Sequence, residues 1–503
     1  MSRKYFLACD IGTSVTKSVL YDDDFKAVAG ASEENATWHK KACWLEEDPK
    51  EWWASVKREI NKVIEGIDPK DIVGIATCGQ MHAPILVDRD GNPLFNCLSW
   101  PDSRTIKLVE EVAEGSGVRQ PYFTSTAPKI LWIKRQYPEI LENTYKVLLP
   151  KDFIRMKLSG TFCTDQNDAG GTAMYDREKK AWNWKIVDYI GLDHDKLPDV
   201  YPSGEIVGAV TEKAAKETGL AAGIPVIAGT GDFGIGRRVE RSVLEPGNIL
   251  LYLGTGPGVT WVPPNESPDR RSRNTSCILG VAGTMPQWFK NTFCQEDVAH
   301  SKKQGVNVFD YLDSKAEEIE PGVDGLIVLP HLMGERSYGG RTAGEEGRLN
   351  PFARGVFHGL CMGHTRYHMF RAIREGITYH LRLCWERIQA ANLGSSSNLI
   401  VATGGGSNSR LWRQIIADVF NLPVYRLKEL ETSTLGLACL TSVSIGMHGS
   451  FEEAASKVEN PMIDLIQPDP GNAARYTEMF QMYKRLETSL EPFFQPTKKP
   501  TCD

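Results

Sequence analysis

A glycine-threonine turn that occurs twice is the feature that most constrains this chain. The first turn, DIGTS at 10–14, lies near the amino terminus, and the second, GTGPG at 254–258, lies roughly half of the 503 residues later. Short apolar runs flank each turn, as expected of β-hairpins. These predicted strands are 5–9 and 18–21 around the first turn, and 248–253 and 259–262 around the second. The repetition favours two structurally related lobes, although two common turns could also coincide.

The rest of the chain alternates between strand and helix patterns. In 51–65 the apolar residues Trp52, Val56, Ile60 and Val63 recur at helical spacing and share one face. We predict further strands at 71–76, 84–87, 223–228 and 399–403, and helices at 129–141, 146–158, about 360–391 and from near Ser409. This alternation is typical of an α/β fold.

The length suggests about three domains, and two large α/β lobes fit it equally well. We expect a first lobe over 1–245, which ends before the second hairpin, and a second lobe over 246–490. The remaining residues, 491–503, contain the proline-rich stretch PFFQPTKKPTCD and are expected to be a frayed tail.

Composition excludes several functional classes. The chain has 58 Lys and Arg against 64 Asp and Glu, and this net charge of -6 argues against a nucleic-acid binder. No apolar run is long enough to cross a membrane, and YFLAC near the amino terminus is too short for a signal peptide. The 11 cysteines are odd in number and lack a CxxC pair, which is typical of reduced thiols. We therefore expect a cytoplasmic enzyme without a membrane partner.

The first turn carries groups that suit a phosphate. Gly12 lets backbone N–H groups approach phosphate oxygens, and Thr13 and Ser14 add hydroxyl donors. Asp10 could hold Mg²⁺, and Lys17 could neutralise a transferring phosphoryl group. An ordinary hairpin turn is the alternative, and no P-loop sequence occurs in the chain.

Two glycine-rich turns in the second half offer further nucleotide contacts. Gly254 and Thr255 repeat the tip of the first hairpin and could hold the same phosphates from another side. Gly404-Gly405-Gly406 lies between a predicted strand and a predicted helix, where the backbone could approach a flat ligand. The spacing is not GxGxxG, so a Rossmann dinucleotide site is not expected. A tight strand-to-helix turn is the alternative.

Asp232 is the candidate catalytic base. It follows the apolar strand 223–228 within GTGDFGIG, where a carboxylate can project from the end of a strand. A kinase needs such a carboxylate to orient the substrate hydroxyl and accept its proton. The alternative is an aspartate that only caps the following helix.

Two clusters carry side chains that suit a sugar. Gln80-Met81-His82 offers an amide and an imidazole for hydroxyl groups, and Met81 offers an apolar wall. In SWPDSR, Trp100 offers a stacking ring, and Asp102 with Arg104 offers a charged pair. A structural histidine and a surface turn with a salt bridge are the respective alternatives.

In order along the chain, six motifs resemble those of the FGGY carbohydrate kinases, and within that family those of the xylulokinases. The two hairpins, DIGTSVTKSVLYD and YLGTGPGV, are similar to the family's two phosphate motifs. KILWIKRQ at 129–136 and RGVFHGLCMGHTRYHMFRAIREG at 354–376 resemble its two signatures. LPHLMGER at 329–336 and TGGGSNSRLWRQIIADVFNLPV are also xylulokinase-like, and the resemblance spans roughly 4–450.

The resemblance implies two actin-like, ribonuclease-H-type α/β lobes, with ATP and sugar in the interdomain cleft. It implies that Asp10 is the Mg²⁺-associated carboxylate and that Asp232 is the catalytic base. It further implies phosphate contacts at Gly12, Thr13, Ser14, Lys17, Gly254 and Thr255, an adenine pocket at Gly404, Gly405, Gly406 and Asn408, and sugar contacts at Gln80, Met81, His82, Trp100 and Asp102.

Two residues depart from the family patterns: Arg374 stands where the second signature usually has an apolar residue, and Phe233 departs from the xylulokinase pattern. Phe233 stands directly after Asp232, where xylulokinases typically have Asn, and the loss of one hydrogen bond to a sugar would cost about 1–3 kcal/mol. We expect ATP- and Mg²⁺-dependent phosphorylation of a terminal hydroxyl of a small ketose or polyol, with D-xylulose as the leading substrate. L-ribulose, erythritol, gluconate and an acyclic signalling sugar remain alternatives.

A non-catalytic actin-like protein that binds a nucleotide or a sugar is a more distant alternative. The presence of Asp232 together with both Gly-Thr turns argues against it. Because dimers are frequent among similar kinases, a homodimer is compatible with the resemblance.

Overall fold

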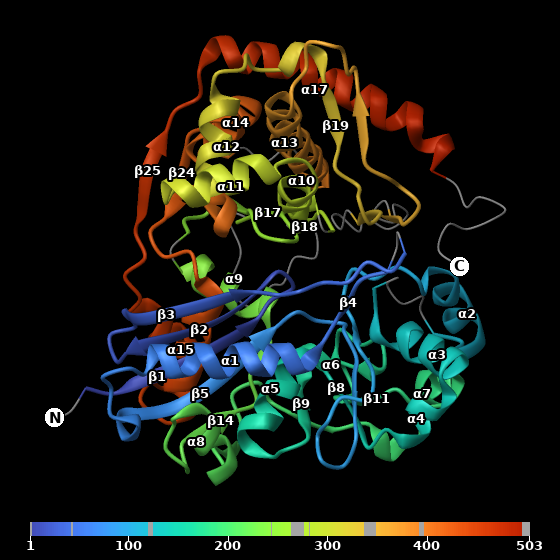
Figure 1. Cartoon of the computed structure of the whole chain (residues 1–503), viewed down its shortest axis with the longest axis vertical. Helices are drawn as coiled ribbons and strands as arrows, with labels where there is room; N and C mark the ends of the chain where they lie inside the picture. Colours follow the sequence, from blue (N-terminus) through green and yellow to red (C-terminus); the bar gives the residue numbers. More distant parts are fainter. Residues whose placement is uncertain are drawn as a thin grey trace. The chain divides into compact units, whose positions relative to one another are not determined.

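The computed structural model describes residues 3–41, 44–118, 124–242, 244–262, 276–280, 282–336, 349–391 and 397–494. The chain divides into two compact units (Figure 1). The first unit runs to Ser242 and also includes Glu431–Glu459, whereas the second runs from there to Leu430 and resumes at Asn460. The division near Ser242 lies close to the expected boundary at 245. The return of Glu431–Glu459 to the first unit departs from two uninterrupted lobes.

A mixed sheet forms the centre of the first unit, in the order β13-β14-β5-β1-β2-β3, with β15 also paired to β5. Strands β1, β2 and β3 form an antiparallel meander, whereas β5, β14 and β15 continue the sheet in parallel with β1. Its strands are β1 (Tyr5–Ile11), β2 (Val15–Asp22), β3 (Ala27–Glu34), β5 (Ile72–Gly79), β13 (Ile206–Ala209), β14 (Pro225–Ile227) and β15 (Thr230–Gly231).

Helices cover both faces of this sheet. Helix α1 packs against β2 and β3 and helix α5 against β5, whereas α15 packs against β1 and β5 together with α9 and α16. The helices of the first unit are α1 (Pro49–Val63), α2 (Ile106–Ser116), α3 (Thr126–Gln136), α4 (Pro138–Asn143), α5 (Pro150–Ser159), α6 (Gln166–Ala169), α7 (Trp184–Ile190), α8 (Glu212–Thr218), α9 (Asp232–Ser242), α15 (Thr432–Ser444) and α16 (Phe451–Ser456).

Strand β1 is buried on both faces, and its residues alternate between two cores. Leu7 and Cys9 belong to the core that includes Trp52 of α1, and Phe6 and Ala8 belong to the core that includes Leu435 of α15. This alternation follows from the two-residue period of a strand. The second core also explains why Glu431–Glu459 leaves the second unit, because the apolar residues of α15 are buried on the first unit's sheet.

Short two-stranded ladders complete the first unit. They pair β4 (Glu46–Glu47) with β7 (Cys97–Leu98), β6 (Ile85–Val87) with β8 (Lys146–Leu148), β9 (Cys163–Asp165) with β12 (Asp199–Tyr201), and β10 (Tyr175–Asp176) with β11 (Ala181–Trp182). The β6–β8 ladder corrects the helix predicted over 146–158. Residues 146–148 pair as a strand, and Pro150 begins α5 because its fixed φ suits the first helical position.

The second unit has a six-stranded sheet in the order β18-β17-β16-β23-β24-β25. Its strands are β16 (Ile249–Tyr252), β17 (Gly258–Trp261), β18 (Ser276–Ile278), β23 (Ile400–Thr403), β24 (Val424–Leu427) and β25 (Met462–Ile466), and two ladders pair β19 (Ile327–Leu329) with β22 (Val356–His358) and β20 (Glu335–Arg336) with β21 (Leu349–Asn350). Its helices are α10 (Met285–Phe293), α11 (Gln295–Gln304), α12 (Val308–Glu317), α13 (Arg366–Ala391), α14 (Arg410–Phe420) and α17 (Pro470–Leu490).

The two sheets repeat one pairing pattern. In each, three antiparallel strands at one edge are followed by parallel strands and end on an antiparallel strand, β13 in the first unit and β25 in the second. Each meander begins with the hairpin that carries Gly-Thr, β1–β2 or β16–β17. The interpretation of two structurally related lobes is therefore confirmed. The long helix of the second unit begins at Arg366 rather than near 360.

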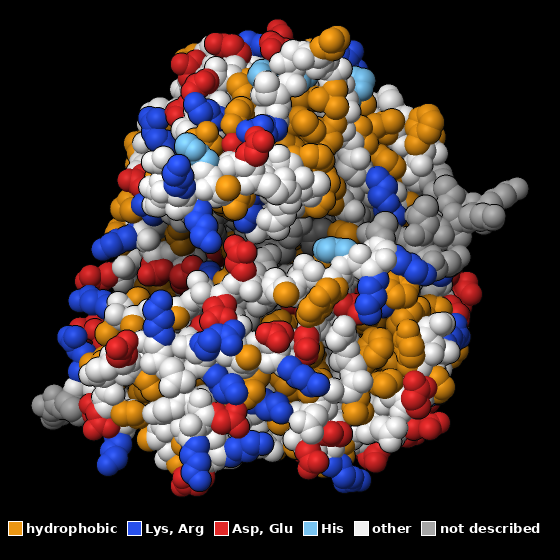
Figure 2. Space-filling model, viewed as in Figure 1, with side chains coloured by type: hydrophobic (Ala, Val, Ile, Leu, Met, Phe, Trp, Pro, Cys, Tyr) orange, Lys and Arg blue, Asp and Glu red, His pale blue; other side chains and the backbone are white. Residues whose placement is uncertain are grey.

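Charges of both signs cover the surface. Figure 2 shows lysine and arginine side chains interspersed with aspartate and glutamate over the face in view, in keeping with the net charge of -6. Within the described residues, every helix is too short or too polar to cross a lipid bilayer.

The turn before β15 gives a test of the fold. Gly229 has a φ of 74°, and a Cβ there would lie 2.0 Å from the Thr77 carbonyl oxygen on β5. Gly223 has a φ of 89° in open space. We expect Gly223→Ala to cost about 1–2 kcal/mol of unfolding free energy through left-handed strain. Gly229→Ala should cost at least about 2 kcal/mol more, because backbone must shift. Equal urea midpoints for the two variants would contradict the described turn.

Candidate active site

Three adjacent strand ends bring Asp10, the predicted Mg²⁺-associated carboxylate, and Asp232, the predicted catalytic base, to one edge of the first sheet. Asp10 on β1 lies opposite Cys78 on β5, and Cys78 lies opposite Thr230 on β15. All three strands are parallel, and neighbouring strands lie about 4.8 Å apart, so the backbones of Asp10 and Thr230 are roughly 10 Å apart. Asp232 begins α9 directly after β15. The carboxyl edge of a parallel sheet is where α/β proteins bind their ligands.

The thiol of Cys78 lies close enough to both carboxylates for their charges to change its pKa. Burial raises the pKa of the Cys78 thiol well above its usual value, and the negative charges of Asp10 and Asp232 raise it further. Both aspartates therefore act on one buried group at the centre of this edge. The thiol stays protonated and serves as a donor to Asp10.

Asp10 has the features of a cation-binding carboxylate. Its Oδ1 is buried without a hydrogen-bond partner. Burial raises the pKa of Asp10 against the opposing effect of Lys17, its neighbour across the hairpin, and Glu431 raises it further. The Lys17 Nζ lies 2.5 Å from Oε2 of Glu431, directly before α15. The unpartnered oxygen of Asp10, with the carboxylate of Glu431 close by, fits a divalent cation, for which oxygen ligands are preferred.

The tip of the first hairpin is held from two sides. Asn35, just after β3, donates from Nδ2 to the carbonyl of Gly12 at 2.7 Å. Trp100 donates from its indole N–H to Oγ1 of Thr13 at 2.8 Å. A Cβ at Gly12 would lie 2.8 Å from the carbonyl oxygen of Val15, so the turn requires glycine there. Trp100, expected on the sugar side, is therefore tied to the phosphate hairpin.

Met81 of the predicted sugar cluster lies next to β15, the strand that directly precedes Asp232, the predicted catalytic base. Met81 packs on Gly231, the residue before Asp232, so closely that a Cβ at Gly231 would lie 2.6 Å from its sulfur. His82 has a φ of 69°, and its Nδ1 lies 2.6 Å from the carbonyl oxygen of Gly171. Met81 therefore lies beside the residue that precedes Asp232, and Met81 and His82 both lie against Gly171.

Gln80 is held at both ends of its amide. Its Nε2 lies 3.1 and 3.2 Å from the two carboxylate oxygens of Glu47, and its Oε1 accepts from Ser99 at 2.9 Å. Glu47 also accepts from the indole N–H of Trp52 at 3.2 Å. All of these side chains are buried. Sequence reasoning missed Glu47, which lies in a short strand, β4, outside every motif.

Lys129 joins the two sugar-side loops. Its buried ammonium donates to the carbonyl oxygens of His82, Ser99 and Trp100 at 3.2, 2.8 and 3.2 Å. The residue lies in the motif KILWIKRQ, so the motif pointed to it, although its contacts did not follow from the sequence. One cation thus fixes the backbone that presents both loops.

Asp102 is engaged entirely within the protein. Its two oxygens accept from the guanidinium of Arg104, with Nη2–Oδ2 at 2.7 Å, and from the backbone N–H of Leu45 at 2.7 Å. The Arg104 guanidinium stacks on the ring of Trp44, 3.8 Å from its centroid. The salt bridge of the alternative interpretation is therefore present, but the pair is buried and does not lie on a surface turn.

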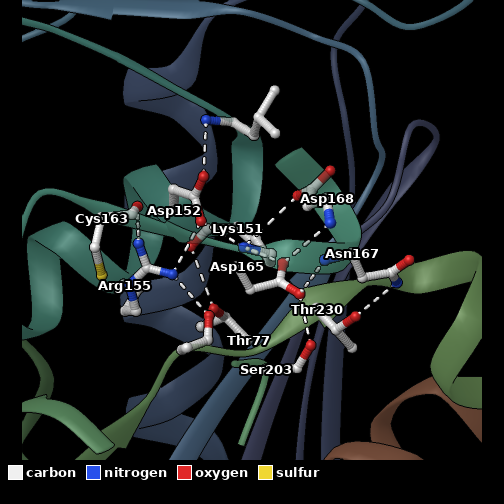
Figure 3. A network of polar contacts seen from close by, with 12 residues as sticks. Thr77, Lys151, Asp152, Arg155, Cys163, Asp165, Asn167, Asp168, Ser203 and Thr230 are labelled. Atoms are coloured by element: carbon white, nitrogen blue, oxygen red, sulfur yellow. Dashed lines mark hydrogen bonds and ion pairs between the residues drawn. The ribbon is translucent and has the colours of Figure 1, made fainter. Parts of the chain in front are cut away.

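A buried charge network lies behind β15 (Figure 3). Lys151 at the start of α5 forms ion pairs with Asp152, Asp165 and Asp168, at 2.5, 3.1 and 3.6 Å. Arg155 completes the network through Asp152 at 2.9 Å and the carbonyl oxygen of Ala228 at 2.7 Å. Burial lowers the pKa of Lys151, but the three carboxylates outweigh it and raise that pKa overall.

Asn167 connects the network to β15, the strand that precedes Asp232. Asp165 caps α6 by accepting from the backbone N–H of Asn167 at 2.9 Å, and Asn167 donates from Nδ2 to Oγ1 of Thr230 at 2.8 Å. Figure 3 shows Asn167 between Asp165 and Thr230 in this chain of contacts. The backbone that carries Asp232 is therefore fixed by buried charges on one side and by β5 on the other. Phe233 follows in α9, and its side chain lies outside the described residues.

In the second unit, two glycine-rich turns lie side by side. Tyr252 of β16 lies opposite Thr403 of β23, so both strands end at one level. Gly404 has a φ of 80°, and a Cβ there would lie 3.1 Å from the backbone nitrogen of Gly254. The N–H of Gly406 donates to the Leu253 carbonyl at 2.9 Å.

The same turn leaves backbone open for a ligand. Gly405 has no atoms within 4 Å of its would-be Cβ, and Asn408 is exposed. Ser409 caps α14 by accepting from the N–H of Trp412 at 3.0 Å, so the predicted helix start is confirmed. The predicted contacts Gly254, Thr255, Gly404, Gly405, Gly406 and Asn408 all belong to this part of the second unit.

Comparison with known proteins identifies the family. Residues 5–236 match the N-terminal domain, and residues 278–445 the C-terminal domain, of the FGGY family of carbohydrate kinases. The chain is 30% identical to a xylulose kinase of Bacillus subtilis, over 96% of this chain and 97% of that one. The chain belongs to the FGGY family of carbohydrate kinases. It is a sugar kinase, and kinases of this family use ATP.

Solved FGGY kinases share the fold. A gluconate kinase from Lactobacillus acidophilus superposes with a TM-score of 0.74 at 25% identity, covering 97% of this chain and 98% of that one. A xylulose kinase from the same organism superposes with a TM-score of 0.72 at 26% identity, with the same coverage. The two-lobe, actin-like ribonuclease-H fold expected from the resemblance is therefore confirmed.

The Glu47 contact predicts a pH-dependent stability. Burial raises the pKa of Glu47 to about 7 from its usual 4.5. A raised carboxyl pKa stabilises the fold at low pH, and this contribution is lost as pH rises through 7, by about 3 kcal/mol in total. Glu47→Gln removes this loss, so its urea midpoint relative to wild type should rise between about pH 5 and about pH 8.

Glu217 provides the matched control for this experiment. It also accepts from an indole N–H, that of Trp53 at 3.0 Å, but its pKa is lowered despite partial burial. Glu217→Gln should show no such rise. A constant difference between Glu47→Gln and wild type at both pH values would mean that Glu47 is not a buried, raised carboxyl group.

Proposed function

We propose that this kinase transfers the γ-phosphoryl group of ATP, with Mg²⁺, to a terminal hydroxyl of a small open-chain ketose or polyol, with D-xylulose as the leading substrate. The observation that carries the proposal is the packing of Met81, the centre of the Gln80-Met81-His82 cluster, on Gly231, the residue before Asp232. A sugar held by this cluster would present a hydroxyl to the carboxylate. The full-length similarity to xylulose kinases supports the same substrate class.

Asp232 is the proposed general base. The carboxylate orients the sugar hydroxyl and accepts its proton as the oxygen attacks the γ-phosphorus, while the bond from that phosphorus to the β–γ bridging oxygen breaks. Its place at the first residue of α9, after a two-residue strand, fixes the carboxylate against the sheet. The buried network behind Thr230 resists movement of that strand.

The first hairpin is proposed to receive the phosphates. Gly12, Thr13 and Ser14 supply N–H and hydroxyl donors. The ammonium of Lys17, which is paired with Glu431, would turn to the phosphate or contact both groups. Asp10, with its unpartnered Oδ1, would hold Mg²⁺ directly or through water. When bound, Mg²⁺ would neutralise charge on the β- and γ-phosphate oxygens. In the second unit, Gly254 and Thr255 are the proposed phosphate contacts that correspond to Gly12 and Thr13. Gly404–Gly406 and Asn408 are the proposed adenine contacts.

Polar side chains in fixed orientations are proposed to select the sugar. Gln80 and His82 are each held by protein partners, so their remaining hydrogen-bonding capacity points in set directions. Asp102 is expected to position the Trp100 loop through Arg104, since both of its oxygens are already used. Phe233 stands where xylulokinases typically have Asn. It is therefore the residue most able to favour a substrate other than D-xylulose.

Gluconate is the second candidate substrate. The gluconate kinase from Lactobacillus acidophilus superposes as well as the xylulose kinase from that organism, with TM-scores of 0.74 and 0.72. The fold therefore favours neither, and the choice depends on side chains near Asp232.

A cytoplasmic location is part of the proposal. In the described stretches of the chain the cysteines are all free thiols, and each except Cys361 is buried. Unbridged buried thiols are typical of a reducing compartment. A homodimer, expected from the family, is testable by light scattering of the purified chain.

Asp232 is tested by an isosteric change. Asp232→Asn should lower kcat at least about 100-fold, because the amide cannot accept the proton, while ATP affinity stays within about threefold of wild type. Steady-state ADP release and calorimetric titration of ATP measure the two quantities. Asp188→Asn, at an exposed position of α7, is the control and should leave both unchanged. A near-wild-type kcat for Asp232→Asn would remove Asp232 from the mechanism.

The substrate is tested by a panel at constant Mg-ATP. We expect D-xylulose to give the highest kcat/KM among D-xylulose, L-xylulose, D- and L-ribulose, erythritol, glycerol and gluconate. Highest turnover with gluconate would keep the kinase chemistry and place specificity at the Phe233 side of the site. ADP release with none of them would refute the proposed substrate class.

A further inference from the structure

A buried cluster of metal-ligating side chains lies in the second unit, apart from the glycine-rich turns. It comprises His331 after β19, His380 on α13 and Glu487 on α17. One ligand atom of each lies within 4.8 Å of the others. The three residues come from segments far apart in the sequence, so it is the tertiary fold that brings them together.

The donor set is more than nine-tenths buried. The exposed fractions are 5% for His331, 1% for His380 and 6% for Glu487. Nε2 of His331 is buried without a hydrogen-bond partner, although a buried imidazole nitrogen is costly to leave unsatisfied. The rings of His331 and His380 meet edge to face, with centroids 4.9 Å apart. A ligand at this point would satisfy the open nitrogen.

A second carboxylate and a hydroxyl surround the donors. Oε1 of Glu335, on β20, lies 3.8 Å from Nε2 of His380, and Oε1 of Glu487 lies 3.8 Å from Nδ1 of the same ring. The hydroxyl of Tyr483 lies 2.9 Å from that Nδ1 and fixes the orientation of the ring. Such outer contacts are typical of histidines that bind metals. Arg387 lies close enough to both carboxylates to balance part of their charge.

We propose that His331, His380 and Glu487 form a structural zinc site, and that Glu335, 3.8 Å from Nε2 of His380, moves in as the fourth ligand. Two imidazoles and carboxylate oxygens are ligands that zinc favours over magnesium or calcium. Ligand atoms around a tetrahedral zinc at about 2.0–2.1 Å are roughly 3.3 Å apart. The ligand atoms of His331, His380 and Glu487 must therefore close by about 1.5 Å at most. Glu335 lies outside that group, and its long side chain must swing further to reach the ion. The ion would join the β19–β20 segment to α13 and α17.

The site is tested by metal binding, independently of any sugar. Tag-free protein, stripped with a chelator, is titrated with Zn²⁺ and with Co²⁺ in the absence of nucleotide. We expect about one ion per chain, the visible absorption of four-coordinate Co²⁺, and a higher melting temperature with Zn²⁺. Failure here would leave the proposed kinase function untouched, since none of these residues belongs to it.

Two variants localise the ion. His331→Gln and Glu487→Gln should each weaken Zn²⁺ binding at least about tenfold and abolish the Co²⁺ spectrum. His358→Gln, at an exposed position of β22 in the same unit, should bind as wild type does. Absence of stoichiometric Zn²⁺ or Co²⁺ binding by the wild-type chain would overturn the proposal, even if a variant failed to fold. Unchanged binding by the two ligand variants would overturn it as well.

Discussion

The parallel pairing of β1, β5 and β15 is the constraint on which the candidate active site depends. This pairing sets Asp10, Cys78 and Thr230 at one level and so fixes how far Asp10 lies from Asp232. A slip of one residue on any strand would turn these side chains to the opposite face of the sheet. Such a slip would also exchange the residues of β1 between its two cores. Burial of both faces therefore protects the geometry of the candidate site.

Buried charges do the remaining positioning around that edge. Lys129 holds the two sugar-side loops through three carbonyl oxygens, and Lys151 with its three aspartates supports the strand before Asp232. Removing a charged group from water costs several kcal/mol, and the cost is offset only when its partners are well placed. A correctly assembled site therefore differs sharply in energy from one with displaced loops. The buried charges therefore hold the loops in place although the loops do not belong to the sheet.

Local patterns predicted the elements and the residues that match family motifs. The two Gly-Thr hairpins, the strand before Gly404 and the helix after Ser409 follow from turn chemistry and apolar spacing, which act over a few residues. Asp232 followed from its place at the end of an apolar strand. Glu431 and Glu47 were missed because their importance depends on partners far away, Lys17 at a separation of 414 residues and Gln80 at 33.

The sequence by itself determined the α/β class, the repetition of one lobe pattern and the positions of the motifs that identify a sugar kinase. Only the tertiary structure decided that α15 packs on the first unit, that Asp102 is buried against Arg104, and that His331 lies beside His380. The physical reason is range. Backbone preferences and apolar periodicity are local, whereas burial and charge pairing are settled only when distant segments compete for the same core.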